Sequence, residues 1–126
     1  MIAGIGIDIA ETSRFLAMHD KYGERFARRI LTDFEYQQLQ TKVHPELYLA
    51  TRFAAKEAAA KALGTGFDQG VGYKSIEVKN DIYGKPELSF YAEAIKIIEQ
   101  KKINNVLLTL SDEKHYVVAM VVAESV

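Results

Sequence analysis

The chain has 126 residues, 48% of them hydrophobic, which is enough for one folded domain but small for a deep cleft, so a large ligand is expected to need a partner subunit. The 16 Lys and Arg residues nearly balance the 17 Asp and Glu residues, so the net charge of −1 favours neither nucleic acid nor an anionic membrane as a partner. The absence of cysteine excludes disulfides, thiolate metal sites and cysteine nucleophiles.

The amino-terminal segment lacks the basic residues and the long apolar run of a signal peptide. No later segment approaches the roughly 18 consecutive apolar residues of a membrane-spanning helix. We therefore expect a cytoplasmic protein.

Residues 2–10 alternate between two kinds of residue, which predicts a β-strand. One side carries isoleucine at positions 5, 7 and 9, and the other carries Gly4, Gly6 and Asp8. Because glycine leaves bare backbone, a bulky ligand or another element of the fold could come close to the Asp8 carboxylate. Alternatively, Asp8 and Glu11 form a variant of the capping box at the start of the next helix, which this segment taken alone favours. The two interpretations are not exclusive, since a carboxylate can both cap a helix and bind a ligand.

The remaining patterns predict helices and strands in the following chain order. Helical spacing covers residues 11–41, with breaks at Gly23 and 31–35; a helix runs from Pro45 to Leu63 and ends at Gly64; 64–72 form a glycine-rich loop; 74–80 and 86–90 are strands; 91–102 are a helix; 104–111 and 115–124 are strands. We therefore expect a single α+β domain over residues 1–126, with a mainly antiparallel sheet packed against a long alanine-rich helix.

The alanine-rich helix carries two charged residues among its apolar positions. Steps of three and four residues define one stripe, which is expected to face the core: Leu47, Ala50, Phe53, Ala54, Glu57, Ala58 and Lys61. Glu57 and Lys61 could form an ordinary ion pair one turn apart, worth roughly 0.2–0.5 kcal/mol on a helix surface. That pair explains the spacing but not the apolar neighbours, because taking a charge out of water costs several kcal/mol. We therefore favour a functional role, with the alanines allowing another element to approach closely.

Asp8 and Glu57 together offer two carboxylate ligands. Such a pair suits Mg²⁺, which keeps several waters and commonly completes its shell with substrate phosphates. Lys61 is then placed to meet the remaining negative charge of a phosphorylated ligand.

The Gly-Thr-Gly segment at 64–66 follows a helix C-terminus, where the helix dipole repels anions, so it is not a Walker-type phosphate loop. A phosphate bound there would rely on Lys61, the Thr65 hydroxyl and inward backbone N–H groups. Gly64 by itself is best explained as a left-handed helix cap.

Four segments resemble a known family. They are GIGIDIAE at 4–11, RFAAKEAAAKALGTG at 52–66, YGKPEL at 83–88 and LSDEKHYVVAMVVAE at 110–124. The sequence is similar to the holo-[acyl-carrier-protein] synthases, the small 4'-phosphopantetheinyl transferases, nearly end to end and in the same order. The first motif, paired with K-E-A-x-x-K-A-x-G-T-G, makes the resemblance highly specific.

The resemblance implies an enzyme that transfers the 4'-phosphopantetheine arm of coenzyme A to a serine of apo acyl carrier protein and releases 3',5'-ADP, in support of fatty acid biosynthesis. It implies that Asp8 and Glu57 hold Mg²⁺ together with the pyrophosphate and that Lys61 contacts phosphate. The other positions implied along the coenzyme A groove are Arg52, Gly64, Thr65, Gly66 and Pro86. Family members of this size are homotrimers whose active sites are shared between adjacent subunits, which agrees with the expectation from chain length.

Other positions depart from the family pattern or have open roles. Glu57 or a water on the metal is the expected acceptor of the serine proton. Many relatives carry a histidine where Asp112 stands here, so a histidine role is not carried over, and His115 nearby is expected to be a turn or surface residue. The larger relatives have another acid where Ala10 stands, so water is expected in that coordination position. His44 either touches the coenzyme A phosphates or is an ordinary residue at the start of the long helix.

Residues 14–29 carry a local net charge of +3, from five Lys and Arg residues against two acidic ones. Acyl carrier proteins are acidic, and a basic patch raises the encounter rate and orients the partner. The resemblance places the carrier on the first helix, with Arg14 and Met18 as leading contacts and Arg25 and Arg28 behind them. Alternatively, these arginines lie on an ordinary solvated helix face.

Two other functions fit the same residues. The chain could be another transferase that consumes coenzyme A or cleaves a nucleotide with the same metal site. It could also be a trimeric binding module that holds a carrier protein or a nucleotide without turnover. Metal-dependent modification of a carrier protein separates these functions.

Overall fold

The structure is a computed structural model that describes all 126 residues. Its elements in chain order are β1 (Ile2–Glu11), α1 (Thr12–Tyr22), α2 (Glu24–Ile30), α3 (Asp33–Leu39), α4 (Pro45–Leu63), the short 3₁₀ helix η1 (Tyr73–Ser75), β2 (Ile76–Asn80), β3 (Pro86–Phe90), α5 (Glu93–Gln100), β4 (Ile103–Asp112) and β5 (Tyr116–Ser125). The predicted α+β class with antiparallel strands and a long helix is confirmed.

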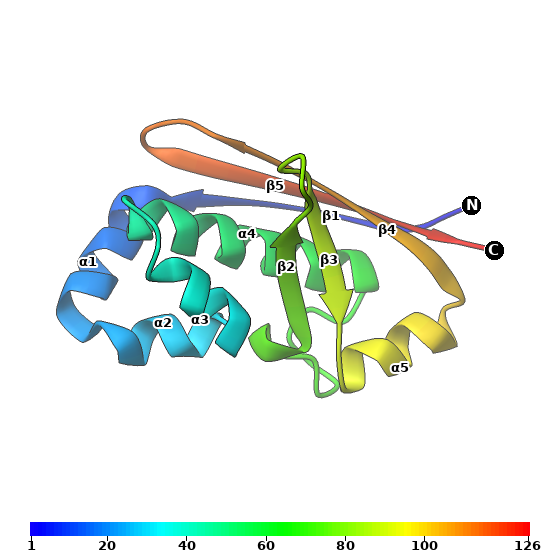
Figure 1. The fold of residues 1–126 in the computed structure, drawn as a ribbon. Helices are drawn as coiled ribbons and strands as arrows, with labels where there is room; N and C mark the ends of the chain where they lie inside the picture. Colours follow the sequence, from blue (N-terminus) through cyan, green and yellow to red (C-terminus); the bar gives the residue numbers. More distant parts are fainter.

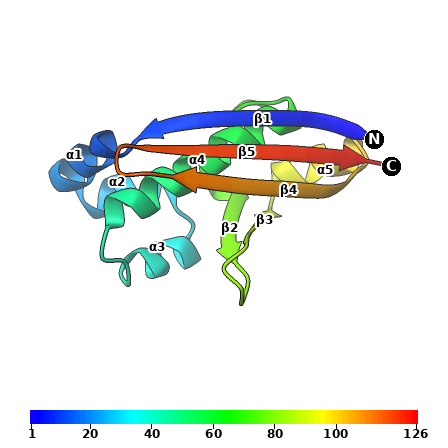
Figure 2. The same ribbon diagram turned by 90° about the horizontal axis from the view of Figure 1, so that it is seen from above.

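A three-stranded antiparallel sheet and α4 form the centre of the fold. The strand order is β1-β5-β4, so β5 lies between the two edge strands. Figure 1 shows α4 running beneath this sheet, with α1, α2 and α3 towards one end of the molecule and α5 at the other. The antiparallel β2-β3 hairpin contacts α4 and projects past the β4 edge of the sheet (Figure 2).

Two glycines of β1 let the backbone of α4 lie directly on the sheet. A Cβ atom added to Gly6 would lie 1.9 Å from the carbonyl oxygen of Ala58, and one added to Gly4 would lie 2.0 Å from that of Ala62. Non-bonded atoms cannot approach so closely, so these positions exclude any side chain. The bare strand surface next to Asp8 is therefore filled by helix backbone and not by a ligand.

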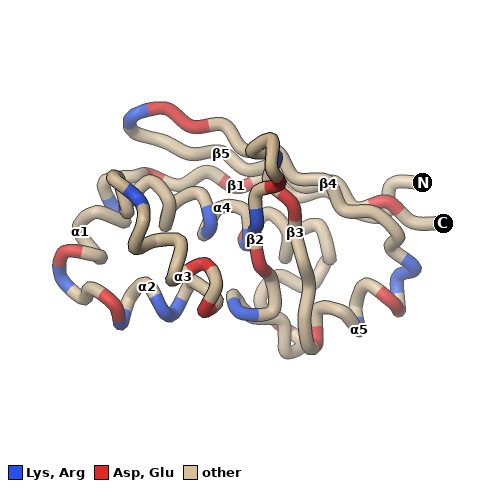
Figure 3. The backbone as a smooth tube through the Cα atoms, in the orientation of Figure 1, with Lys and Arg blue, Asp and Glu red and all other residues tan.

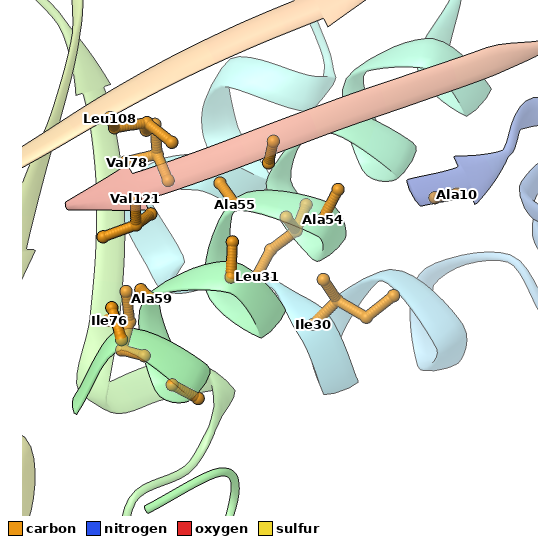
Figure 4. Close-up of a cluster of buried hydrophobic side chains, with 14 of the residues drawn as sticks. Ala10, Ile30, Leu31, Ala54, Ala55, Ala59, Ile76, Val78, Leu108 and Val121 are labelled. Atoms are coloured by element: carbon orange, nitrogen blue, oxygen red, sulfur yellow. The ribbon is translucent and has the colours of Figure 1, made fainter. Parts of the chain in front are cut away.

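Most of the circumference of α4 is buried, because the sheet covers one side while α1, α2 and β2 contact others. Alanines 54, 55 and 59 lie among side chains from β5, β4 and β2, including those of Val121, Leu108 and Ile76 (Figure 4). The expectation that the stripe through Glu57 and Lys61 faces the core holds for its alanines, since Ala50, Ala54 and Ala58 are fully buried. It is wrong for the two charged residues, because Glu57 is half-buried and Lys61 is exposed.

The predicted capping box at Asp8 is also wrong. β1 continues through Asp8, which pairs with Ala119 of β5, and the strand ends only at Glu11. α1 begins at Thr12, and its N-cap residue Glu11 makes no side-chain capping hydrogen bond. Continued pairing with β5 satisfies several backbone groups of this segment, whereas a cap would satisfy one or two.

The other elements match the predicted ones with shifted boundaries. The helical region 11–41 is divided into α1, α2 and α3, residues 73–75 form a 3₁₀ turn before β2, and α5 is shorter than the predicted 91–102. None of the helices combines the length and hydropathy needed to span a bilayer.

The outer face of the sheet, away from α4, is apolar and exposed. Ile5, Ile7 and Ile9 of β1 are 63%, 62% and 64% exposed. Met120 of β5 pairs with Ile7, and Leu107 of β4 lies opposite Val122 of β5, so the apolar surface is continuous across all three strands.

Candidate active site

Asp8 lies in β1 with its side chain directed at α4. Its Oδ1 is 3.2 Å from the Nζ atom of Lys61, while its Oδ2 is buried and has no hydrogen-bond partner. The carboxylate is 16% exposed, so one of its oxygens is both desolvated and unsatisfied. An orphaned buried acceptor of this kind is costly unless a ligand occupies the position beside it.

Lys61 links α4 to β1. Its ammonium donates to the carbonyl oxygen of Ile7 at 2.8 Å as well as to Asp8, and its side chain remains 50% exposed. It forms no ion pair with Glu57 one turn earlier on the same helix. The ordinary helix-surface pair considered from the spacing is therefore wrong, because the strand offers Lys61 a second partner in addition to a carboxylate.

Glu57 is half-buried, and its Oε1 accepts a hydrogen bond from the hydroxyl of Tyr73 at 2.9 Å. The pKa of Tyr73 is raised, first by burial, then by the Glu57 hydrogen bond and charge, and to a smaller extent by the charge of Asp8. Glu57 lies one turn before Lys61 on α4, and Lys61 contacts Asp8, so the two carboxylates lie on the same side of this helix.

The residues at this site fit a metal ion that needs few protein ligands. No group of three or more Asp, Glu or His side chains is arranged to hold a metal. Mg²⁺ is commonly bound by one or two carboxylates, with water and substrate phosphates completing its shell. The free, buried Oδ2 of Asp8 and the neighbouring Glu57 provide oxygen donors of this type.

The Gly64-Thr65-Gly66 segment follows Lys61 at the end of α4. Gly64 has a φ of 80° and caps the helix through a hydrogen bond from its N–H to the carbonyl oxygen of Lys61, as expected for a left-handed cap. The Thr65 hydroxyl donates to the carbonyl oxygen of Gly66 at 2.8 Å. These three residues therefore form a tight turn directly after the last turn of α4, which contains Lys61.

A second group of predicted residues lies at the opposite edge of the sheet. Arg52 and Pro86 line one cavity of about 470 Å³, which Asp112 of β4 also lines. Arg52 is buried, its Nη2 donates to Asn80 at 3.1 Å, and its Nε has no partner. Asp8 lies on β1 and this cavity lies beside β4, so β5 separates the two groups.

His44 belongs to neither group. It precedes α4 and lines a third cavity, of about 410 Å³, with His115 and residues from α1 and the β4-β5 turn. Its ring is 71% exposed, with Nδ1 3.6 Å from Glu46. Within one chain, His44 lies at the start of α4, about two turns before Arg52 and at the opposite end of the helix from the turn at 64–66.

The predicted carrier surface is basic and partly apolar. Lys and Arg positions gather along α1 and α2, with acidic positions between them (Figure 3). Met18 and Arg25 line a cavity of about 260 Å³ together with two aromatic residues and Arg29. Arg14 lies over the Phe15 and Phe53 rings, whereas Arg28 is paired with Glu24 at 2.7 Å and with Asp33 at 3.3 Å.

Two residues near the site were missed by the sequence analysis. Lys56 is fully buried and pairs with Glu35 at 2.6 Å, and burial, partly opposed by Glu35, lowers the pKa of Lys56. A lysine that directly follows two alanines of an alanine-rich helix was the available signal for Lys56. The sequence held no such signal for Tyr73. This residue follows a glycine-rich loop without helical or strand periodicity, so its contacts cannot be predicted from residue spacing.

Comparisons with known proteins cover nearly the whole chain. Residues 4–121 match the family described as the 4'-phosphopantetheinyl transferase superfamily. The chain is 48% identical over 124 residues to a holo-[acyl-carrier-protein] synthase of Pectobacterium carotovorum, covering 98% of each chain. The fold resembles that of holo-[acyl-carrier-protein] synthase from Neisseria meningitidis, with a TM-score of 0.93 and 44% identity, over 99% of this chain and 100% of that one. It also resembles a Bacillus anthracis holo-(acyl-carrier-protein) synthase in complex with CoA (3',5'-ADP), with a TM-score of 0.83 and 41% identity, over 100% of this chain and 99% of that one.

Proposed function

The chain belongs to the 4'-phosphopantetheinyl transferase superfamily, and on that premise we propose that it is a Mg²⁺-dependent, homotrimeric holo-[acyl-carrier-protein] synthase. It transfers the 4'-phosphopantetheine group of coenzyme A to a serine of apo acyl carrier protein and produces holo carrier protein and 3',5'-ADP. A cytoplasmic role in fatty acid biosynthesis is part of the same proposal. The observation that carries the assignment of the site is the buried, unpartnered oxygen of Asp8 next to Lys61.

The reaction requires charge neutralisation and a place for one proton. The serine oxygen bonds to the phosphorus of the pantetheine phosphate, the bond from that phosphorus to the bridging oxygen breaks, and 3',5'-ADP leaves with the electron pair. Lys61 stabilises the phosphate charge, since its half-exposed ammonium reaches solvent beside Asp8. Glu57 or a water beside it accepts the serine proton, since the Oε2 atom of Glu57 has no hydrogen-bond partner within the chain. Mg²⁺ held by Asp8 and Glu57 supplies further neutralisation of the pyrophosphate when it is bound.

The division of the candidate residues between two sheet edges supports a site shared between subunits. Asp8, Glu57 and Lys61 lie towards the β1 edge, and Arg52 with Pro86 lies beside the β4 edge of the same chain. In a closed ring, two different surfaces of neighbouring subunits meet, and in this proposal they are the β1 edge of one subunit and the β4 edge of the next. Coenzyme A would then bind to both groups at once.

The apolar outer face of the sheet supports the same assembly. Its isoleucines and Met120 form a patch that spans strands and has no partner within the chain. Soluble monomers rarely expose a contiguous apolar surface of this kind. Burial of these faces against one another around a threefold axis would remove the patch from water.

We propose that the acidic carrier protein binds to α1 and α2, because these helices expose basic residues beside an apolar cavity. Arg14 and Arg25 supply positive charge, and Met18 lines the adjoining cavity. Arg28 contributes less in this proposal, because two carboxylates already neutralise it.

Intact-mass measurement of apo acyl carrier protein tests the function directly. The carrier is incubated with this protein and coenzyme A, in the presence of Mg²⁺ or of EDTA. A mass gain of one phosphopantetheine only with Mg²⁺ is the expected result. No gain with several apo carriers and folded protein would leave a binding module without turnover as the better description.

A further inference from the structure

Tyr73 is the one side chain that donates a hydrogen bond to Glu57. The hydroxyl is 2.9 Å from Oε1, and Oε2 makes no hydrogen bond or ion pair within the chain. Tyr73 belongs to η1, which follows the glycine-rich loop after α4. The contact therefore joins two segments 16 residues apart in sequence, at the carboxylate that the proposed reaction uses.

The Tyr73 side chain packs against two other aromatic rings. Its ring stacks on Phe53 of α4 with centroids 5.8 Å apart, and the Phe67 ring lies 4.2 Å away. Three aromatic rings in contact restrict one another's rotation, because each fills the space into which the others would turn. The direction of the hydroxyl is consequently fixed by packing.

The backbone of Tyr73 is held as well. Its carbonyl oxygen accepts a hydrogen bond from the fully buried ammonium of Lys56 at 2.9 Å. The same ammonium binds the carbonyl oxygen of Ile30 at 2.7 Å and the Glu35 carboxylate at 2.6 Å. A residue anchored through such a network presents its hydroxyl from a rigid part of the fold.

The hydrogen bond also separates two charged partners on α4. Glu57 and Lys61 are spaced for an ion pair one turn apart, yet Lys61 binds Asp8 and Ile7 instead. With Oε1 occupied by Tyr73, Glu57 is held away from Lys61. Loss of the hydroxyl would release the carboxylate to rotate towards the lysine.

We propose that Tyr73 is a positioning residue for Glu57, which holds one carboxylate oxygen so that the other remains available to Mg²⁺. This inference rests on the proposed function. At other metal sites, a group that donates a hydrogen bond to a metal ligand orients that ligand, and its loss lowers metal affinity about 10- to 100-fold. Tyr73 would act on Glu57 in this way.

The test is the Tyr73→Phe variant, which keeps the ring and its stacking. Mg²⁺ is titrated into the protein saturated with coenzyme A in a calorimeter, and kcat and the Mg²⁺ dependence of turnover are measured with apo carrier protein. We expect the Mg²⁺ dissociation constant to rise about tenfold. The matched control is Tyr91→Phe, because Tyr91 donates to Glu77 at the same 2.9 Å, away from the site.

The outcomes distinguish a failure of this inference from a failure of the proposed function. Tyr73→Phe with a Mg²⁺ affinity within twofold of the parent overturns it, even if the parent is fully active. An equal loss of affinity in Tyr91→Phe also overturns it, since the effect would then be general. A parent that modifies no carrier refutes the proposed function, while the calorimetric comparison still tests Tyr73. A parent that binds no Mg²⁺ beside coenzyme A overturns the inference and the metal assignment together.

Discussion

Lys56 and Lys61 lie five residues apart on α4, but one belongs to an ion pair that is buried and the other to an ion pair that is partly open to solvent. Lys56 is fully buried and donates to three acceptors, including the Glu35 carboxylate. Lys61 is half-exposed and binds only one oxygen of Asp8, so the other oxygen has no partner. The first pair is complete within the chain, and the second has a position open to a ligand.

The comparison shows that a buried charge is not by itself a sign of a binding site. Glu35 also accepts hydrogen bonds from the backbone N–H groups of Thr32 and Val78, so its negative charge is satisfied without any ligand. This network joins α3, α4 and β2. Asp8 has fewer partners although it is also poorly exposed, and its unsatisfied oxygen makes it a better candidate ligand for a bound group than the fully paired Glu35.

The largest expected effect comes from breaking the buried pair. Lys56→Met removes the ammonium and leaves Glu35 charged in the core, so the free energy of unfolding should fall by about 3–5 kcal/mol. Urea denaturation monitored by circular dichroism measures this change in the free energy of unfolding. The double variant Glu35→Gln with Lys56→Met should recover part of the loss, because no isolated charge remains. A single variant within about 1 kcal/mol of the parent would show that the pair matters little.

Neutralising Asp8 should lower turnover and leave stability nearly unchanged, whereas Lys56→Met should mainly lower stability. Asp8→Asn keeps the shape of the side chain, so unfolding should change by no more than about 1 kcal/mol. Turnover should fall about 100-fold or more, because one proposed Mg²⁺ ligand is lost. Steady-state kinetics across a range of Mg²⁺ concentrations measures the effect. Undiminished Mg²⁺-dependent turnover in this variant would refute the metal assignment of Asp8.

A smaller effect is expected at the surface outside both pairs. Arg14→Glu should raise the KM for the carrier about tenfold and flatten its dependence on salt. The matched control is Lys96→Glu on α5, which lies at the other end of the molecule (Figure 1). A salt dependence equal to that of the parent would count against a carrier surface on α1.

The smallest effect concerns Glu77, a carboxylate satisfied within the chain like Glu35. Burial raises its pKa, but hydrogen bonds from Thr32 and Tyr91 and the charge of Lys79 outweigh burial and lower it. The resulting stability is present above the unfolded pKa of about 4.3 and is lost as pH falls through the lower folded value. Glu77→Gln should therefore flatten the decline of unfolding free energy between about pH 5 and pH 3. An identical acid profile in the variant would contradict this assignment.

Several local features could be predicted from sequence because their causes are local. Alternation in residues 2–10 predicts β1, and Pro45 with Gly64 predicts both ends of α4, where the structure has them. The placement of Lys61 beside Asp8 could not be obtained from spacing, since it depends on α4 crossing β1 at Gly4 and Gly6. The site roles of these residues remain predictions for the experiments above.

The sequence by itself determined the α+β class, most of the elements and the residues of the family motifs, because backbone preferences and hydrophobic periodicity act over a few residues. Only the tertiary structure decided that Asp8 continues a strand, that Lys56 is the buried charge and that Tyr73 binds Glu57. The same is true of the distribution of the candidate residues between two edges of the sheet. These contacts join distant segments, and long-range packing chooses among partners that local spacing leaves equivalent.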